Sequence, residues 1–158
     1  MGKGLTALPT LVFRLEEQLF GMPLHQVERV LRAVEITSLP DAPEKILGFV
    51  NDHGRQLPVM DIRRRLSLPP SPIHPDQRII IALGRRPFCF FVDTVNGVVD
   101  FRQEEFRSPE EIYPGMEHFL SAIFTWSGDT VLVFDCDLLF ASSHADTVWQ
   151  EMHHPART

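Results

Sequence analysis

Residues 46–62 read ILGFVNDHGRQLPVMDI, and this stretch contains the clearest hairpin signal in the chain. Apolar residues occupy both arms, and the connection between them, Asp52-His53-Gly54-Arg55, is polar and contains a glycine. Apolar runs that flank a short glycine turn are typical of a β-hairpin. We therefore expect two strands around this turn. A short helix should follow Asp61, whose carboxylate can accept hydrogen bonds from the first helical turn.

The residue pattern of the first half of the chain recurs in the second half. With a shift of 68 residues, six apolar residues fall on six others: Val12, Leu15, Phe20, Leu24, Val27 and Val30 fall on Ile80, Leu83, Phe88, Val92, Val95 and Val98. With a shift of 74 residues, three further positions match: Gly54, Val59 and Asp61 fall on Gly128, Val133 and Asp135. We interpret this ordered series as an internal two-fold repeat.

Short apolar runs separated by Gly and Pro turns favour small β-barrels, because a closed sheet has no exposed edge. We therefore predict a mostly all-β chain of two small barrels packed on each other, with short helices, in one domain over residues 10–140. One barrel is expected mainly from residues 20–80. The other is expected mainly from residues 85–140 together with exchanged N-terminal strands. Residues 141–158 are expected to form a tail or a final helix.

Composition and charge exclude several classes of protein. The chain has 158 residues, of which 44% are apolar, so we expect one folded domain with a core. A net charge of −6 argues against nucleic acid as the main partner, because phosphate binding needs a basic surface. No stretch approaches about 20 apolar residues, so we expect a cytoplasmic protein without membrane insertion. Cys89 and Cys136 lie in apolar runs and are expected to be buried free thiols.

The neighbours Asp52 and His53 raise the question of catalysis or metal binding. Nucleophilic catalysis needs a nucleophile within reach of the histidine, and no Ser or Cys lies near His53 in the sequence. A metal site needs three or four converging ligands, whereas a turn would splay these two side chains. We therefore favour a surface recognition turn and predict no catalytic, metal or cofactor site. A small hydrolase or metalloenzyme at this turn is the alternative. Residues 63–65, three arginines, are interpreted as a solvated helix face.

Four segments carry a resemblance to a known family. The most specific is residues 36–66, in which LPDAP is followed by ILGFVN, a glycine turn and LPVMD; the others are residues 11–32, 78–99 and 131–140. In this order they resemble the CheW family, the coupling proteins of bacterial chemotaxis. The resemblance implies two five-stranded β-barrels and a non-enzymatic adaptor without a cofactor. Such adaptors bridge the cytoplasmic tip of chemoreceptors (methyl-accepting chemotaxis proteins) and the regulatory domain of the histidine kinase CheA, in membrane-associated receptor arrays.

The resemblance also implies a groove between the barrels that receives a receptor helix. The residues predicted to line it or to face the receptor are Leu24, Val27, Val30, Asn51, His53, Val95 and Val98. For the apolar members, burial in the core is the alternative, and we expect it for at least half of them. The family usually has Asn-Leu-Arg-Gly at the hairpin turn, where this chain has Asn51-Asp52-His53-Gly54. That arginine is tied to receptor contact in the family, and a histidine is mostly uncharged at neutral pH.

Overall fold

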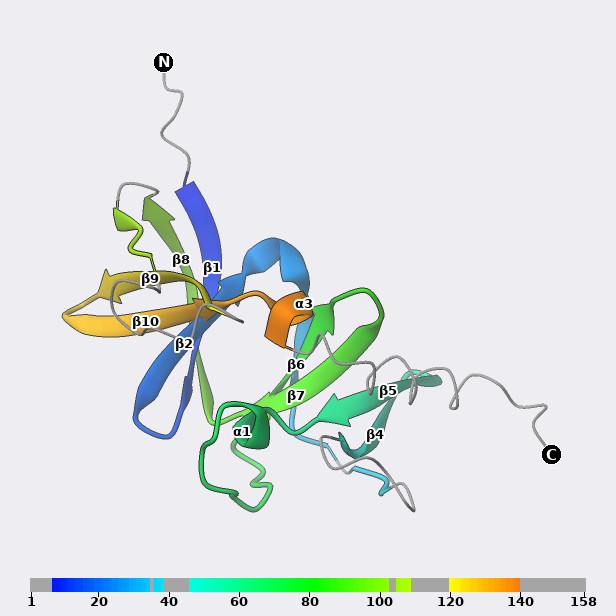
Figure 1. Ribbon diagram of the computed structural model, residues 1–158. Helices are drawn as coiled ribbons and strands as arrows, with labels where there is room; N and C mark the ends of the chain where they lie inside the picture. Colours follow the sequence, from blue (N-terminus) through cyan, green and yellow to red (C-terminus); the bar gives the residue numbers. More distant parts are fainter. Residues whose placement is uncertain (1–6, 35, 39–45, 103–104, 109–119, 140–158) are drawn as a thin grey trace.

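The computed structural model describes residues 7–34, 36–38, 46–102, 105–108 and 120–139, most of which lie in two five-stranded sheets (Figure 1). The elements in chain order are β1 (Ala7–Leu15), β2 (Gln18–Pro23), η1 (Leu24–Gln26), β3 (Val27–Arg32), β4 (Ile46–Asp52), β5 (Arg55–Met60), α1 (Ile62–Arg65), β6 (Arg78–Leu83), β7 (Pro87–Val92), β8 (Thr94–Arg102), β9 (Leu120–Trp126), β10 (Asp129–Phe134) and α3 (Cys136–Leu139). The predicted mostly-β fold of two five-stranded units is confirmed. None of the described helices is long and apolar enough to cross a membrane. The predicted tail or helix at 141–158 lies outside the described residues.

The two halves of the repeat exchange strands with each other. One sheet has the order β8-β1-β2-β10-β9, and the other has the order β3-β6-β7-β5-β4. Each sheet thus combines the first two strands of one half with the last three strands of the other half. The predicted barrel over residues 85–140 is therefore wrong in one respect, because β7 pairs with β5 and β6 in the other sheet. The exchange is reciprocal, whereas the sequence indicated it only for the N-terminal strands.

Each sheet curls far enough for its two edges to meet at a single bridge. Beyond β3, Thr37 exchanges two backbone hydrogen bonds of 2.9 Å with Phe49 of β4. Beyond β8, Arg107 exchanges two of 3.1 Å with Ile123 of β9. Among the described residues the edges meet only at these bridges, so each barrel is closed by one residue pair and not by a full strand ladder. The equivalent position of the two bridges supports the internal repeat.

The core has three layers, and β1 and β6 each contribute to two of them. Leu11, Phe13 and Leu15 of β1 point into a cluster between the two sheets, whereas Val12 points into the first sheet's own interior. In β6, Ile80 joins the central cluster, and its neighbours Ile79 and Ile81 fill the interior of the second sheet. Strands that are buried on both faces read as continuous apolar runs. This explains why TLVF and IIIA lack the apolar–polar alternation of half-exposed strands.

Aromatic rings occupy the centre of the cluster between the sheets. The centroid of the fully buried Phe13 ring lies 5.8 to 6.2 Å from those of Phe20, Phe90 and Phe134. These distances lie in the range at which aromatic pairs add about 0.5–1.5 kcal/mol beyond the burial of their surface. Because Phe90 belongs to the second sheet and the other three rings to the first, these contacts hold the sheets together.

The short helices begin at the two aspartates that the repeat had matched. The Asp61 carboxylate accepts a hydrogen bond of 3.2 Å from the Arg64 amide at the start of α1. The Asp135 carboxylate accepts one of 2.8 Å from the Asp137 amide at the start of α3. The predicted capping role of Asp61 is therefore confirmed, and Asp135, its counterpart in the repeat, caps α3 in the same way.

The prediction that residues 63–65 form a solvated face is wrong for Arg63. Its side chain is 10% exposed, and its guanidinium forms ion pairs with Glu16 and, at 2.6 Å, with Asp93. Glu16 lies in the β1–β2 turn, and Asp93 is the one residue between β7 and β8. Arg63 therefore joins the second sheet's helix to the first sheet and to the chain that crosses between them. The sequence did not reveal this role, because both partners are distant along the chain.

Asp93 is held in its charged form by this network. Partial burial raises its pKa, but hydrogen bonds from the Glu16 amide, Arg63 and Gln77 outweigh that effect and lower the pKa overall. The other crossover between the sheets, from β2 through η1 to β3, is also fixed by a polar contact. The buried side chain of Gln26, in η1, accepts a hydrogen bond of 3.0 Å from the Cys136 amide. Each of the two chain crossovers between the sheets is thus tied to one of the short helices.

We predict that Arg63→Met lowers the free energy of unfolding by about 2 kcal/mol, because it leaves the partly buried Asp93 carboxylate without its cation. Methionine keeps the helix propensity of the position. Arg64→Met, at an exposed position of the same helix, is the matched control and should change stability much less. Urea unfolding followed by tryptophan fluorescence measures both variants. Equal effects of the two substitutions would show that Arg63 does not join the sheets.

Candidate partner-binding surface

Two short rows of valines, one on β3 and one on β8, each lie on the face of their own sheet that turns toward the central cluster. In β3, Val27 and Val30 stand opposite Ala82 and Ile80. Both of these partners belong to the central cluster between the sheets. Residues that are directly opposite in an antiparallel pair share one face of the sheet. The valines of β3 therefore face the side on which the two sheets meet.

The second row repeats this arrangement on β8. Val95 and Val98 stand opposite Phe13 and Leu11 of β1, which also belong to the central cluster. Val98 is 52% exposed, and Val30, its counterpart in the repeat, is 36% exposed. The two valine rows are defined here as Val27 and Val30 on β3 with Val95 and Val98 on β8.

The structure divides the predicted groove residues into supporting and exposed positions. Val27 and Val95 are half-buried and pack on the central cluster. They therefore hold the surface in place and offer little area for contact with a partner. Val30 and Val98 are exposed, and so is Leu24 in η1, directly before β3. Exposed valines in strands whose neighbours are fully buried form an apolar surface that a partner can cover.

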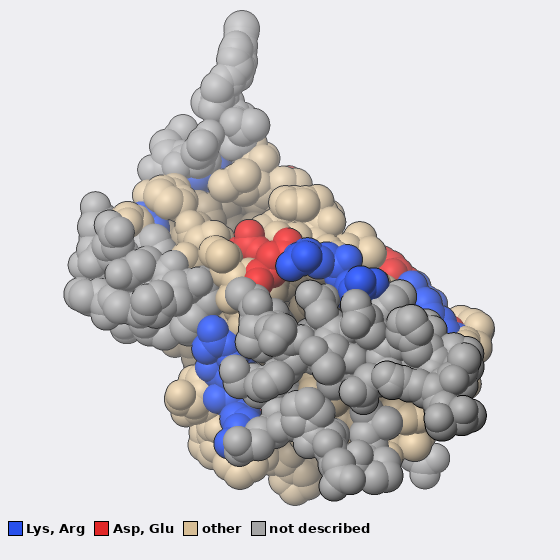
Figure 2. Space-filling model, turned by 45° about the vertical axis from the view of Figure 1, so that its right-hand side comes forward, with Lys and Arg blue, Asp and Glu red and all other residues tan. Residues whose placement is uncertain are grey.

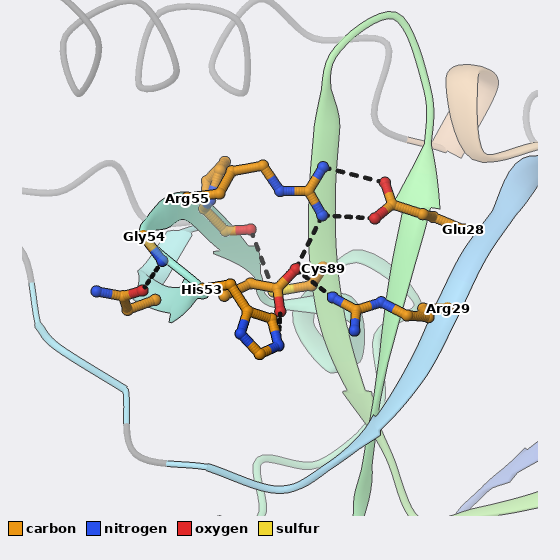
Figure 3. Close-up of polar contacts among 9 residues, drawn as sticks. Glu28, Arg29, His53, Gly54, Arg55 and Cys89 are labelled. Atoms are coloured by element: carbon orange, nitrogen blue, oxygen red, sulfur yellow. Dashed lines mark hydrogen bonds and ion pairs between the residues drawn. The ribbon is translucent and has the colours of Figure 1, made fainter.

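Asn51 and His53 lie at the β4–β5 turn. His53 and Gly54 are its two central residues and have φ values of 53° and 89°, the left-handed region that a two-residue hairpin turn requires. The Asn51 side chain accepts a hydrogen bond of 2.7 Å from the Gly54 amide, so it stabilises the turn (Figure 3). The His53 side chain is 85% exposed and projects from the turn. The predicted hairpin is confirmed, and its histidine is accessible.

Asp52 ties this turn to β3 through a network of charges (Figure 3). Its carboxylate, 6% exposed, pairs with the guanidinium of Arg29 and, at 2.9 Å, with that of Arg55. Arg55 also donates two hydrogen bonds, of 3.1 and 2.5 Å, to the carboxylate of Glu28. Glu28 and Arg29 lie between Val27 and Val30 in β3, so the network joins the turn to the strand that carries these valines. Arg29 stands opposite Ile81, on the face of β3 that points away from Val30.

The charge network also fixes the protonation state of Asp52. The hydrogen bond from Arg29 is the main cause of a lowered Asp52 pKa; burial opposes this effect, and Arg55 adds to it. The sequence contained one signal of this role, because Ile46, Gly48, Val50 and Asp52 alternate along β4 and all face inward. An aspartate at an inward position must find a cationic partner, since an isolated buried charge is very costly. Which arginines would supply it was not visible in the sequence.

The same contacts argue against a hydrolase or metal site at this turn. The Asp52 carboxylate already accepts from two guanidinium groups, and the His53 Nε2 atom lies 3.9 Å from its other oxygen. Among the described residues, no three His, Cys, Asp or Glu side chains converge as metal ligands. Both cysteines are buried and free, as predicted, and burial raises the pKa of each thiol to about 12. Neither thiol can supply a thiolate nucleophile at neutral pH.

Charged side chains of both signs share the surface of the molecule. On the face drawn in Figure 2, the basic side chains of the described residues form separate groups, and acidic side chains lie directly beside one of them. A nucleic acid backbone would require a continuous basic surface. This face is better suited to a partner that itself carries charges of both signs.

We predict that Asp52→Asn lowers the free energy of unfolding by about 1–3 kcal/mol at pH 7, because it removes the charge that pairs with Arg29 and Arg55. The pKa of Asp52 is lowered on folding, so its contribution is present above the unfolded-state value of about 4 and is lost as the pH falls through the folded-state value. Urea unfolding at pH 7 and pH 3 measures the difference between the two proteins. The difference should shrink at pH 3, and an unchanged difference would contradict the prediction. Asp129→Asn, at the exposed first residue of β10, is the control.

Comparison with known proteins places this architecture in a family. A family model described as the CheW-like domain matches residues 9–144. The chain is 25% identical to the probable chemotaxis protein CheW of Rhizobium etli over 138 residues, which cover 86% of this chain and 89% of the relative. It is 30% identical to the chemotaxis protein CheW of Bacillus subtilis over 102 residues, 64% of this chain and 65% of the relative.

A solved structure agrees with the sequence relatives. The crystal structure of the scaffolding protein TtCheW from Thermoanaerobacter tengcongensis superposes with a TM-score of 0.78 and 26% identity, over 88% of this chain and 96% of that protein. Since the family model also covers most of the chain, this protein belongs to the family of CheW-like domain proteins.

Proposed function

We propose that this protein is a non-catalytic adaptor that couples chemoreceptors to a chemotaxis-type histidine kinase. The observation that carries the proposal is the pair of valine rows on a CheW-like fold, each of which has one exposed member, Val30 or Val98. The relatives' names support it, because they describe chemotaxis proteins and a scaffolding protein. The receptor tips with which the protein would work are cytoplasmic, so the proposal places it in the cytoplasm at receptor arrays.

The receptor partner is proposed to lie on the valine rows. A chemoreceptor tip is helical, and an amphipathic helix docks by placing its apolar side chains on an apolar surface. Burial of such surface contributes about 25 cal/mol per Å² before the cost of association. Leu24 extends the exposed apolar surface at the start of β3, and His53 stands at the neighbouring turn. All seven residues predicted from the sequence are therefore retained in this proposal, with Val27 and Val95 as supports.

An adaptor also needs a second surface for the kinase. Leu47 of β4 and Ile73 of the connector before β6 are exposed beside a pocket of about 100 Å³, whose floor includes Met60 and Phe91. This apolar patch belongs to the second sheet and to elements other than β3 and β8. We propose it as the contact for the regulatory domain of the kinase CheA. Two separate patches would let one molecule hold both partners at once.

We predict that Val98→Glu weakens binding to a chemoreceptor cytoplasmic fragment more than tenfold, because it would place a charge in an apolar contact. Binding to the kinase regulatory domain should stay within twofold of wild type. Isothermal titration calorimetry with each partner alone measures both affinities. Because Val98 is exposed, the variant should fold normally, and circular dichroism checks this point.

Leu47→Glu is the matched control, since it places the same charge on the second patch. It should weaken binding to the kinase regulatory domain and leave binding to the receptor fragment unchanged. If Val98→Glu leaves receptor binding unchanged in a folded protein, the valine rows are not the receptor surface. If neither partner binds the wild-type protein, the adaptor function itself is wrong.

A further inference from the structure

We propose that Arg32 and Asp100 determine the direction in which a partner helix lies across the valine rows. The inference rests on the proposed function only in taking these rows as the partner's surface. It adds the kind of helix that the surface accepts, which has an apolar stripe with an acidic side chain at one end and a basic side chain at the other.

Arg32 and Asp100 continue the two rows at equivalent positions. Arg32 follows Val30 by two residues in β3, and Asp100 follows Val98 by two residues in β8, so each shares the face of its valine. The repeat shift of 68 residues that maps Val30 onto Val98 also maps Arg32 onto Asp100. Both charged side chains are exposed. The two rows therefore match in their valines and differ in the sign of the charge that follows.

The two charges lie toward opposite ends of β8. Arg32 stands directly opposite Arg78 of β6, and the neighbouring Gln77 donates a hydrogen bond of 3.1 Å to Asp93, the residue before β8. Arg32 is therefore near the start of β8. Asp100 is near the end of that strand and stands opposite Pro9. Seven residues of strand separate Asp93 from Asp100, a length of roughly 20 Å.

The end near Arg32 contains two arginines that pair with no carboxylate among the described residues, because the nearby Asp93 carboxylate pairs with Arg63. Like charges that stand directly opposite in a strand pair repel each other. Arg78 donates to the backbone carbonyls of Asp76 and Gln77, at 3.3 and 3.2 Å. Within the described part of the chain, neither Arg32 nor Arg78 forms an ion pair. A partner carboxylate placed here would relieve this repulsion.

The charges matter because the valines alone do not define a direction. Two rows related by an internal repeat present nearly the same apolar surface to a helix and to the same helix reversed. A cation at one end and an anion at the other remove this equivalence. A helix that spans about 20 Å has about 13 residues, so its end charges fall near Arg32 and Asp100. Each exposed ion pair contributes little by itself. Reversing the helix, however, would place like charges together at both ends and turn attraction into repulsion.

The experiment uses a designed helical peptide of about 20 residues with one apolar stripe, glutamates in its first turn and lysines in its last turn. This order also suits the helix dipole. A spin label on the glutamate end broadens the amide signals of nearby residues in the NMR spectrum of the protein. In the wild-type protein the broadening should centre on Arg32 and Arg78. In the double variant Arg32→Asp/Asp100→Arg it should move to the end of β8.

Affinity provides a second readout. The single variant Arg32→Asp makes both ends acidic and should weaken binding of the peptide about three- to tenfold, with a smaller effect at high salt. Asp129→Arg, an exposed charge reversal at the first residue of β10, is the control and should leave direction and affinity unchanged. The inference is overturned if the label broadens the same residues in wild type and double variant. It is also overturned if the peptide does not bind the rows.

These outcomes separate the inference from the adaptor function. A protein that binds receptor and kinase but orients the peptide in both directions equally would keep the proposed function and lose the inference. A protein that orients the peptide but binds neither receptor nor kinase would keep the inference and lose the proposed function.

Discussion

The contact between the two sheets is the constraint on which the rest of the structure depends. Phe13 and Phe134 of the first sheet meet Phe90 of the second, and none of these rings is exposed to solvent. This contact is possible because each half of the repeat gives two strands to the other half's sheet. Neither sheet can form from one half alone, so the folding of each half requires the other.

Ion pairs with a buried member fix a short helix and a hairpin turn in place. Arg63 ties a helix of the second sheet to the turn of the first, and Asp52 ties the β4–β5 turn to β3. Removing one member of a buried ion pair is costly, because the other is left in a poorly solvated position. Such pairs contribute little to net stability, but they permit few alternative arrangements. In this molecule they fix the crossover at Asp93 and the β4–β5 turn.

The candidate surface takes its shape from the same arrangement. β3 and β8 are the edge strands beside β6 and β1, the two strands that are buried on both faces. Val27 and Val95 can therefore pack on the central cluster, while Val30 and Val98, on the same faces, remain open to a partner. A surface built on strands that pack against the core is rigid, which lowers the entropy lost when a partner binds. The apolar patch at Leu47 and Ile73 is separate from it, as an adaptor requires.

The internal repeat was visible in the sequence because the same apolar and turn signals recur at shifts of 68 and 74 residues. Local signals were sufficient for the strand-rich fold, the β4–β5 hairpin and the caps at Asp61 and Asp135. Each depends on residues that are close along the chain, where periodicity and turn chemistry act directly. The sequence also placed the valines of the partner surface, although that assignment depended on the family resemblance and stays a prediction. Only the tertiary structure decided that β7 joins β5, that Arg63 is buried and that Asp52 pairs with Arg29. These features join residues that are more than 20 positions apart. Their partners are chosen by the way the sheets pack, and no local pattern records that choice.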